Sequence, residues 1–227
     1  MPGLVTATYR VRTVALPGPA GMLEAVVNEG APNAPFAALV CHPHPLGRGT
    51  LHNKVVYHAM KALNAREWGL GWPVLRFNFR GVGRSEGVHD GRAEAGDVLA
   101  AVHWIENEYK LPGVVAGFSF GAVMALMACC GQGEGKPAVR AIAALGLPTL
   151  AQGRDYDYAF LRDCKVPKLF LSGDGDQYAA SESLRQVVEA APDPKQLVFI
   201  SSTDHFFAGH LQTMQRELAG WLKEHVL

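Results

Sequence analysis

The feature that most constrains this chain is the pentapeptide Gly117-Phe118-Ser119-Phe120-Gly121, which lies between two apolar runs. Residues 114–116 precede it and residues 122–127 follow it, so the pattern predicts a buried strand that runs into a serine and then directly into a helix. Gly-x-Ser-x-Gly is typical of a tight strand-to-helix turn that strains its serine and raises the hydroxyl above the sheet. The two glycines are expected because side chains there would collide with the neighbouring strand and helix.

Two later apolar segments end in the residues that such a serine needs. Residues 166–172 run into Gly173-Asp174-Gly175-Asp176, and residues 196–200 run into a loop that ends at His205. The serine, an acid and a histidine thus follow one another in the chain, each just past a predicted strand. This order predicts a Ser-His-Asp triad at the carboxyl edge of a sheet.

The acid of the triad must be chosen among three aspartates. Asp176 is favoured because it lies further past its strand, where the loop turns toward the serine. Asp174 is expected instead to tie the turn through its own backbone hydrogen bonds. Asp204 adjoins His205, and since consecutive residues rarely point the same way, it is interpreted as a loop cap.

The alternation of strands and helices predicts a single α/β domain over residues 1–227. Its sheet is expected to be doubly wound, mostly parallel and built from about eight strands, with helices on both faces. Residues 8–16 and 22–28 are predicted to form a hairpin-like pair at one edge. Only residues 148–165 offer room for a cap over the site, and this stretch is too short for a lid domain. The remaining strands are expected near 36–41, 71–79, 114–116, 139–147, 166–172 and 196–200, and the helices near 53–67, 94–109, 122–130, 181–191 and 210–225.

An oxyanion formed at the serine would need two backbone N–H donors. One is expected from Phe120, at the start of the helix. The other is expected from the loop after the strand at 36–41, in which Pro43 and Pro45 have no N–H. His44 is therefore the better candidate by position, and Leu46 is the second.

Composition limits the other possibilities. The 21 Lys and Arg residues equal the 21 Asp and Glu residues, so no basic field predicts binding to nucleic acid or an anionic membrane. The amino terminus lacks the pattern of a secretory signal, and no apolar stretch is long enough to span a bilayer. The four cysteines, which have no metal-ligand spacing, are interpreted as buried thiols of a cytoplasmic protein; they are Cys41, Cys129, Cys130 and Cys164.

His42 and His44 are the only pair that suggests a metal site. Their segment contains no carboxylate, so a metal site is not predicted there. His42 is instead expected to pack within its loop and to hydrogen-bond to backbone.

Several stretches together resemble a family of small, lidless α/β hydrolases, close to the dienelactone-hydrolase-like group. They cover most of the chain from Phe36 to His210, and they are Cys41 to Leu46, Asn53 to Val56, Leu75 to Gly87, Ala116 to Gly121, Gly173 to Asp176 and Asp204 to Phe207. The resemblance implies the α/β-hydrolase fold with a minimal lid or none. It also implies that Ser119, Asp176 and His205 form the catalytic triad.

Two residues depart from the pattern of that family. Dienelactone hydrolases proper resemble this chain but have a cysteine nucleophile, so their lactone specificity does not transfer to a site with Ser119. Arg48 stands where relatives usually have a second glycine. It would narrow the mouth of the site or offer a cation to an acidic substrate.

The function expected from these observations is a serine hydrolase, and specifically a carboxylesterase acting on small to medium acyl esters through an acyl-enzyme. Neither a cofactor nor a metal is expected, and the partner is a small-molecule ester. A peptidase, a thioesterase or an acyltransferase would use the same triad. A non-catalytic binding scaffold is the alternative outside enzymes. The sequence fixes neither the natural substrate nor the oligomeric state.

Overall fold

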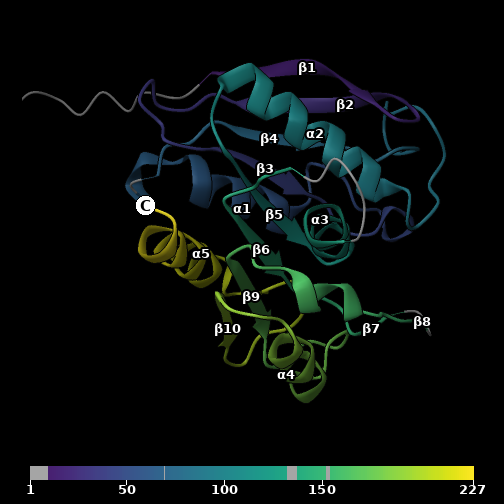
Figure 1. Ribbon diagram of the computed structural model, residues 1–227, viewed down its shortest axis with the longest axis vertical. Helices are drawn as coiled ribbons and strands as arrows, with labels where there is room; N and C mark the ends of the chain where they lie inside the picture. The colour runs from purple at the N-terminus through teal and green to yellow at the C-terminus, as the bar shows by residue number, and fades with distance from the viewer. Residues whose placement is uncertain (1–9, 69, 132–136, 152–153) are drawn as a thin grey trace, which may run out of the picture.

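An eight-stranded sheet forms the centre of the protein (Figure 1). The structure is a computed structural model that describes residues 10–68, 70–131, 137–151 and 154–227. Only the pairs β1–β2 and β2–β4 are antiparallel within this sheet, which confirms the mostly parallel, doubly wound arrangement predicted above. In spatial order the strands are β1 (Val11–Gly18), β2 (Gly21–Asn28), β4 (Val74–Phe77), β3 (Ala37–Cys41), β5 (Gly113–Phe118), β6 (Ala141–Leu145), β9 (Lys168–Gly173) and β10 (Lys195–Ile200).

Helices cover both faces of the sheet, as Figure 1 shows. On one face, α2 (Glu94–Tyr109), α3 (Phe120–Cys130) and α4 (Ser181–Ala190) bury apolar side chains in one core cluster. On the other face, α1 (Lys54–Asn64) and α5 (Leu211–His225) pack against each other and form the second cluster with the sheet. Within the described residues, no helix combines the length and the apolar character that crossing a bilayer requires.

The order in which strands are added to the sheet changes direction at β3. From β3, the chain adds β4 on one side and then β5 on the other side. Because all these strands are parallel, the loops that follow β3 and β5 diverge at the carboxyl edge of the sheet and leave a crevice between them. The serine turn follows β5 and the loop of His44 follows β3, so both lie at this point.

The edge hairpin extends further than predicted. β1 continues through Pro17 to Gly18 and pairs with β2 from Gly21, so the turn consists of residues 19 and 20 alone. Pro17 is tolerated because β1 is the edge strand of the sheet, where a missing N–H breaks no ladder. The predicted start of this strand at Thr8 lies outside the described residues.

The segment predicted to provide a minimal cap contains a short antiparallel pair, β7 (Leu150–Ala151) and β8 (Arg154–Asp155), and the 3-10 helix η3 (Ala159–Asp163). The pair is attached to the rest of the protein through Tyr178, whose carbonyl accepts hydrogen bonds from the N–H groups of Thr149 and Leu150. The segment is too short to form a lid domain, as expected.

One prediction about the cysteines is wrong. Cys130, at the end of α3, and Cys164, just after η3, form a disulfide with their Cα atoms 5.0 Å apart. The two residues are separated by 34 positions in the chain. The sequence could not reveal that η3 folds back onto the end of α3 and brings them together. The prediction of a cytoplasmic location used all four cysteines as free thiols. Two of them form this disulfide, and Cys41 and Cys129 are free.

Candidate active site

Ser119 occupies a sharp turn between β5 and α3. Its backbone angles, φ 55° and ψ −120°, are unusual for a residue with a side chain. A Cβ atom at Gly117 would lie 2.3 Å from the carbonyl oxygen of Gly121, and one at Gly121 would lie 2.5 Å from the carbonyl oxygen of Cys41. Both glycines are therefore required for the chain to reverse this tightly, as the sequence predicts.

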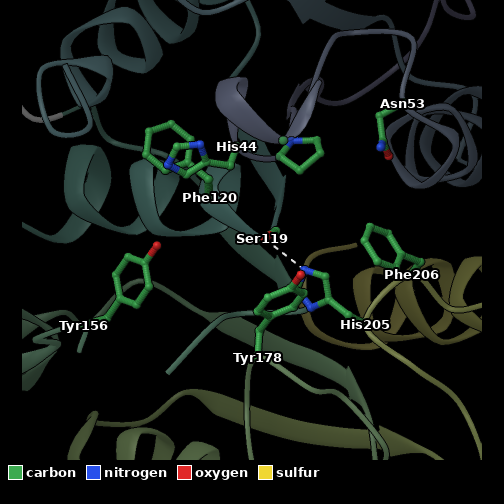
Figure 2. Close-up of a pocket in the computed structure, with 10 residues that line it drawn as sticks. His44, Asn53, Ser119, Phe120, Tyr156, Tyr178, His205 and Phe206 are labelled. Atoms are coloured by element: carbon green, nitrogen blue, oxygen red, sulfur yellow. Dashed lines mark hydrogen bonds between the residues drawn. The ribbon is translucent and has the colours of Figure 1, made fainter. Parts of the chain in front are cut away.

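The structure brings Ser119, His205 and Asp176 together from three loops at the carboxyl edge of the sheet (Figure 2). The Ser119 Oγ lies 2.9 Å from the His205 Nε2, and the His205 Nδ1 lies 2.8 Å from the Asp176 Oδ2. A carboxylate only accepts, so His205 carries its proton on Nδ1 and its Nε2 accepts from the serine hydroxyl. The imidazole is thus in the tautomer that can take a proton from Ser119.

The side chain of Asp176 is fully buried, with both oxygens engaged. Its Oδ1 accepts from the backbone N–H of Tyr178 at 2.8 Å, and its Oδ2 accepts from the Ser172 hydroxyl at 3.0 Å as well as from His205. These bonds fix the orientation of the carboxylate and hold it against the imidazole.

The other two aspartates play different parts. Asp174 is exposed, and its backbone binds the turn through an N–H donated to the carbonyl of Ile200. The Oδ1 of Asp204 accepts from the N–H groups of Phe206 and Ala208, both at 3.0 Å. Asp204 is therefore a loop cap, as the sequence predicts.

Aromatic rings surround His205. The ring centroid of Tyr178 lies 4.7 Å from that of His205, Phe118 lies at 5.0 Å, and Phe206 lies at 5.2 Å. With only 3 % of its side chain exposed, the imidazole has little freedom to leave its position between the serine and the aspartate.

Two backbone segments frame the space above Ser119. Phe120 is the first residue of α3, where an N–H group has no partner within the helix and the helix dipole favours negative charge. His44 precedes the 3-10 helix η1 (Pro45–Gly47), and its ring lies 4.9 Å from the ring of Phe120. The N–H of Leu46 donates to the Nδ1 of His44 at 3.2 Å, so it is already engaged.

Arg48 has a left-handed backbone, with φ 61°. Glycine adopts this conformation without steric cost, whereas residues with a side chain adopt it less often. The arginine side chain is exposed to solvent.

His42 links the loop after β3 to the loop after the neighbouring strand β4. Its Nδ1 lies 2.7 Å from the carbonyl oxygen of Pro43, and its Nε2 accepts from the backbone N–H of Phe79 at 3.0 Å. A carbonyl only accepts and an N–H only donates, so the imidazole is neutral with its proton on Nδ1. Burial lowers the pKa of His42 to about 4. The predicted role of this residue, packing its loop through backbone hydrogen bonds, is confirmed.

We expect His42 to make the stability of the protein depend on pH. Its pKa is about 4 when folded and about 6.5 when unfolded, so the unfolded chain binds more protons between these values. The contribution of His42 is complete above pH 6.5 and is lost as the pH falls toward 4, at a cost of up to about 3 kcal/mol. Urea unfolding at several pH values between 4.5 and 7 would measure this slope for the wild type and for His42→Gln.

The variant should show a shallower slope than the wild type. His103→Gln is the matched control, because His103 is exposed on α2 and should leave the slope unchanged. Parallel curves for the wild type and His42→Gln would contradict the assignment of a neutral, buried imidazole.

A cavity of about 160 Å³ opens above the serine. Tyr156 and Tyr178 line it and were not predicted from the sequence, nor were the contributions of Asn53 and Phe206. Tyr156 comes from the cap segment and Tyr178 from the loop two residues past Asp176, and neither stands out in the sequence. The cavity is lined by Pro43, His44, Gly47, Asn53, Ser119, Phe120, Tyr156, Tyr178, His205 and Phe206.

The two free cysteines do not line this cavity. Cys41 and Cys129 are buried, and burial raises the pKa of both thiols, to about 12 for Cys129. A thiolate is the reactive form of cysteine, so neither residue competes with Ser119 as a nucleophile.

Comparisons with known proteins agree with this fold. A crystal structure of a lidless α/β serine hydrolase from Xanthomonas campestris, XC6422, is 30% identical, with a TM-score of 0.80 over 95% of this chain and 94% of that chain. An α/β serine hydrolase homologue from Coxiella burnetii is 31% identical, with a TM-score of 0.79 over 93% of this chain and 97% of that chain. The uncharacterized protein RP471 of Rickettsia prowazekii is 34% identical over 214 residues, which are 90% of this chain and 86% of that protein.

The family model for the alpha/beta hydrolase domain matches residues 40–224. This range begins in β3, before the His44 loop, and ends in α5, so it includes every residue named above around the serine. The chain belongs to the α/β hydrolase family, with the eight-stranded, mostly parallel sheet that its sequence implies and, within the residues that the structure describes, no lid domain.

Proposed function

We propose that this protein is a serine hydrolase, and specifically a carboxylesterase that cleaves small to medium acyl esters through an acyl-enzyme. The observation that carries the proposal is the continuous chain of hydrogen bonds from Ser119 through His205 to the buried Asp176. A hydroxyl bonded to the unprotonated nitrogen of a held imidazole is an activated nucleophile. The open cavity above it leaves room for an ester.

In the first step the Ser119 Oγ attacks the ester carbonyl carbon while its proton passes to the His205 Nε2. Asp176 stabilises the imidazolium that forms. The carbonyl oxygen becomes an oxyanion, which accepts from the N–H groups of Phe120 and His44. His44 is the expected second donor by its position in the loop after β3, and the N–H of Leu46 donates to the ring of His44.

The tetrahedral intermediate then collapses. The bond between the carbonyl carbon and the alcohol oxygen breaks as His205 returns the proton to that oxygen. The acyl group remains bound to Ser119. Water attacks this ester with His205 again as the base, releases the carboxylic acid and restores the serine hydroxyl. The cycle consumes one water and needs no cofactor.

A panel of substrates that share one acyl group tests this reaction. We expect p-nitrophenyl acetate to be hydrolysed much faster than p-nitroacetanilide. The site is open to solvent, and p-nitrophenol is a better leaving group than p-nitroaniline. A fluorophosphonate probe should label the protein, and peptide mapping should place the label on Ser119. Absence of both turnover and labelling would reject the enzyme and favour a binding scaffold.

The same panel separates the ester from its alternatives. An acetyl thioester hydrolysed faster than the oxygen ester, after correction for its alkaline hydrolysis rate, would indicate a thioesterase. Preference for the anilide would indicate a peptidase, and a faster release of p-nitrophenol with added alcohols would indicate an acyltransferase.

A further inference from the structure

Asn53 contributes an amide to the cavity above Ser119. It is the N-cap residue of α1, and its Oδ1 accepts from the backbone N–H groups of Val55 at 2.9 Å and Val56 at 3.4 Å. An N–H group only donates, so the amide oxygen must face the helix and the amide nitrogen must face away from it. The cap therefore fixes which end of the amide is presented to the cavity.

The amide nitrogen of Asn53 is not used by the fold. Within the residues that the structure describes, no group accepts a hydrogen bond from the Asn53 Nδ2, and the side chain is half-buried. An amide donor in this position binds water until a ligand oxygen replaces it. Its two N–H groups can thus donate to an oxygen of a bound substrate.

The proposed chemistry places Asn53 on the side of the leaving alcohol. The His205 Nε2 returns its proton to the alcohol oxygen, so the alcohol must lie beside that atom. The ring centroid of Phe206 lies 5.2 Å from that of His205, and Phe206 marks this side of the cavity. In Figure 2 the Asn53 amide points toward Phe206, whereas Tyr156 lies on the other side of Ser119.

Two packed helices support this side of the cavity. α1 begins directly after Asn53, and α5 begins shortly after Phe206. The helices pack against each other, and the Nδ1 of His58 lies 3.1 Å from the Oε1 of Gln215 near their first turns. Asn53 is thus positioned by rigid elements, and its donors need little ordering when a substrate binds.

The cavity favours an alcohol without charge. None of the lining residues in the described part of the chain is Lys, Arg, Asp or Glu. A charged group on the alcohol would lose water there without gaining a partner of opposite charge. An ether, hydroxyl or carbonyl oxygen can instead accept directly from an amide N–H.

We infer that the preferred substrates are esters of neutral alcohols that carry a second oxygen a few bonds from the ester, and that Asn53 binds this oxygen through its Nδ2. The inference rests on the proposed function, since the position of the alcohol is assigned from His205. An aliphatic alcohol of the same size would displace water from the amide N–H groups and give them no acceptor in return. Asn53 is accordingly a residue that determines alcohol specificity.

Two butyrate esters that differ at one position test this. 2-Methoxyethyl butyrate has an ether oxygen where n-butyl butyrate has a methylene, and the acyl group and the length of the alcohol are the same. We expect kcat/KM for the methoxyethyl ester to exceed that for the butyl ester by about fivefold. The rates are measured by pH-stat titration and corrected for the alkaline hydrolysis rates of the two esters.

Two variants remove the donors and keep the helix cap. Asn53→Asp should reduce the ratio to one or below, because a carboxylate still accepts from the first turn of α1 but has no N–H to donate. Asn53→Ser should reduce it to near one without adding charge, since serine also caps a helix but is too short to reach the substrate. Each ratio is taken within one variant, so a general change in rate cancels.

Asn33→Asp is the matched control, because Asn33 is exposed and does not line the cavity, so its ratio should equal that of the wild type. Thermal unfolding of each variant checks that the fold is retained. A wild-type ratio near one, or a ratio unchanged in either Asn53 variant, would overturn the inference and leave the hydrolase intact. Hydrolysis of p-nitrophenyl acetate without hydrolysis of the methoxyethyl ester would do the same. Loss of all wild-type turnover and of fluorophosphonate labelling would reject the proposed function itself and the inference with it.

Discussion

Replacing Ser119 with alanine is expected to lower kcat for p-nitrophenyl acetate by about 10⁶-fold. The change removes the hydroxyl that lies 2.9 Å from the unprotonated nitrogen of His205. Without that hydroxyl no acyl-enzyme can form. The two oxyanion donors can then stabilise only the direct attack of water on the ester. Steady-state kinetics and the loss of fluorophosphonate labelling would measure the effect.

A second variant separates the hydroxyl from the backbone that carries it. Ser119 has a positive φ of 55°, which strains any residue with a Cβ atom, so Ser119→Gly should be as inactive as Ser119→Ala but more stable by about 1 kcal/mol. Urea unfolding of the two variants compares their stabilities. Substantial activity in both variants would mean that another group is the nucleophile.

Much of the fold follows from local sequence patterns. Continuous apolar runs such as residues 166–172 predict strands with both faces buried, and β9 is buried along its whole length. The serine, the acid and the histidine can be located because each follows such a run, and parallel strands bring their carboxyl ends to one edge. Asp176 is preferred among the aspartates because it lies further past its strand, and the burial of Asp176 beside exposed Asp174 agrees with that choice.

What the sequence does not reveal depends on contacts between distant segments. The pairing of Cys130 with Cys164 requires the fold of η3 against α3, and no spacing rule encodes it. Tyr178 is a similar case, because its N–H holds Asp176, its ring contacts His205 and its carbonyl holds the β7–β8 pair. Each of these bonds is set by tertiary packing, and the residue type alone gives no signal.

The second large effect is expected at the acid. Asp176→Asn should lower kcat/KM by about 10⁴-fold, because the surroundings of this side chain dictate how an amide would lie. The Tyr178 N–H, 2.8 Å from Oδ1, requires an oxygen at that position. The amide nitrogen must then replace Oδ2 and face the His205 Nδ1. It would donate to Nδ1, move the ring proton to Nε2 and leave the histidine unable to accept from Ser119.

Asp174→Asn is the matched control, since it makes the same change two residues away on an exposed side chain and should leave kcat/KM within about twofold. Nitrogen-15 NMR of the His205 ring would report the tautomer directly, with the proton on Nδ1 in the wild type and on Nε2 in Asp176→Asn. Equal losses in the two variants would count against Asp176 as the triad acid. An unchanged tautomer in an inactive Asp176→Asn would keep Asp176 as the acid but assign its effect to the lost charge, because a neutral amide stabilises the imidazolium of the transition state far less than a carboxylate does.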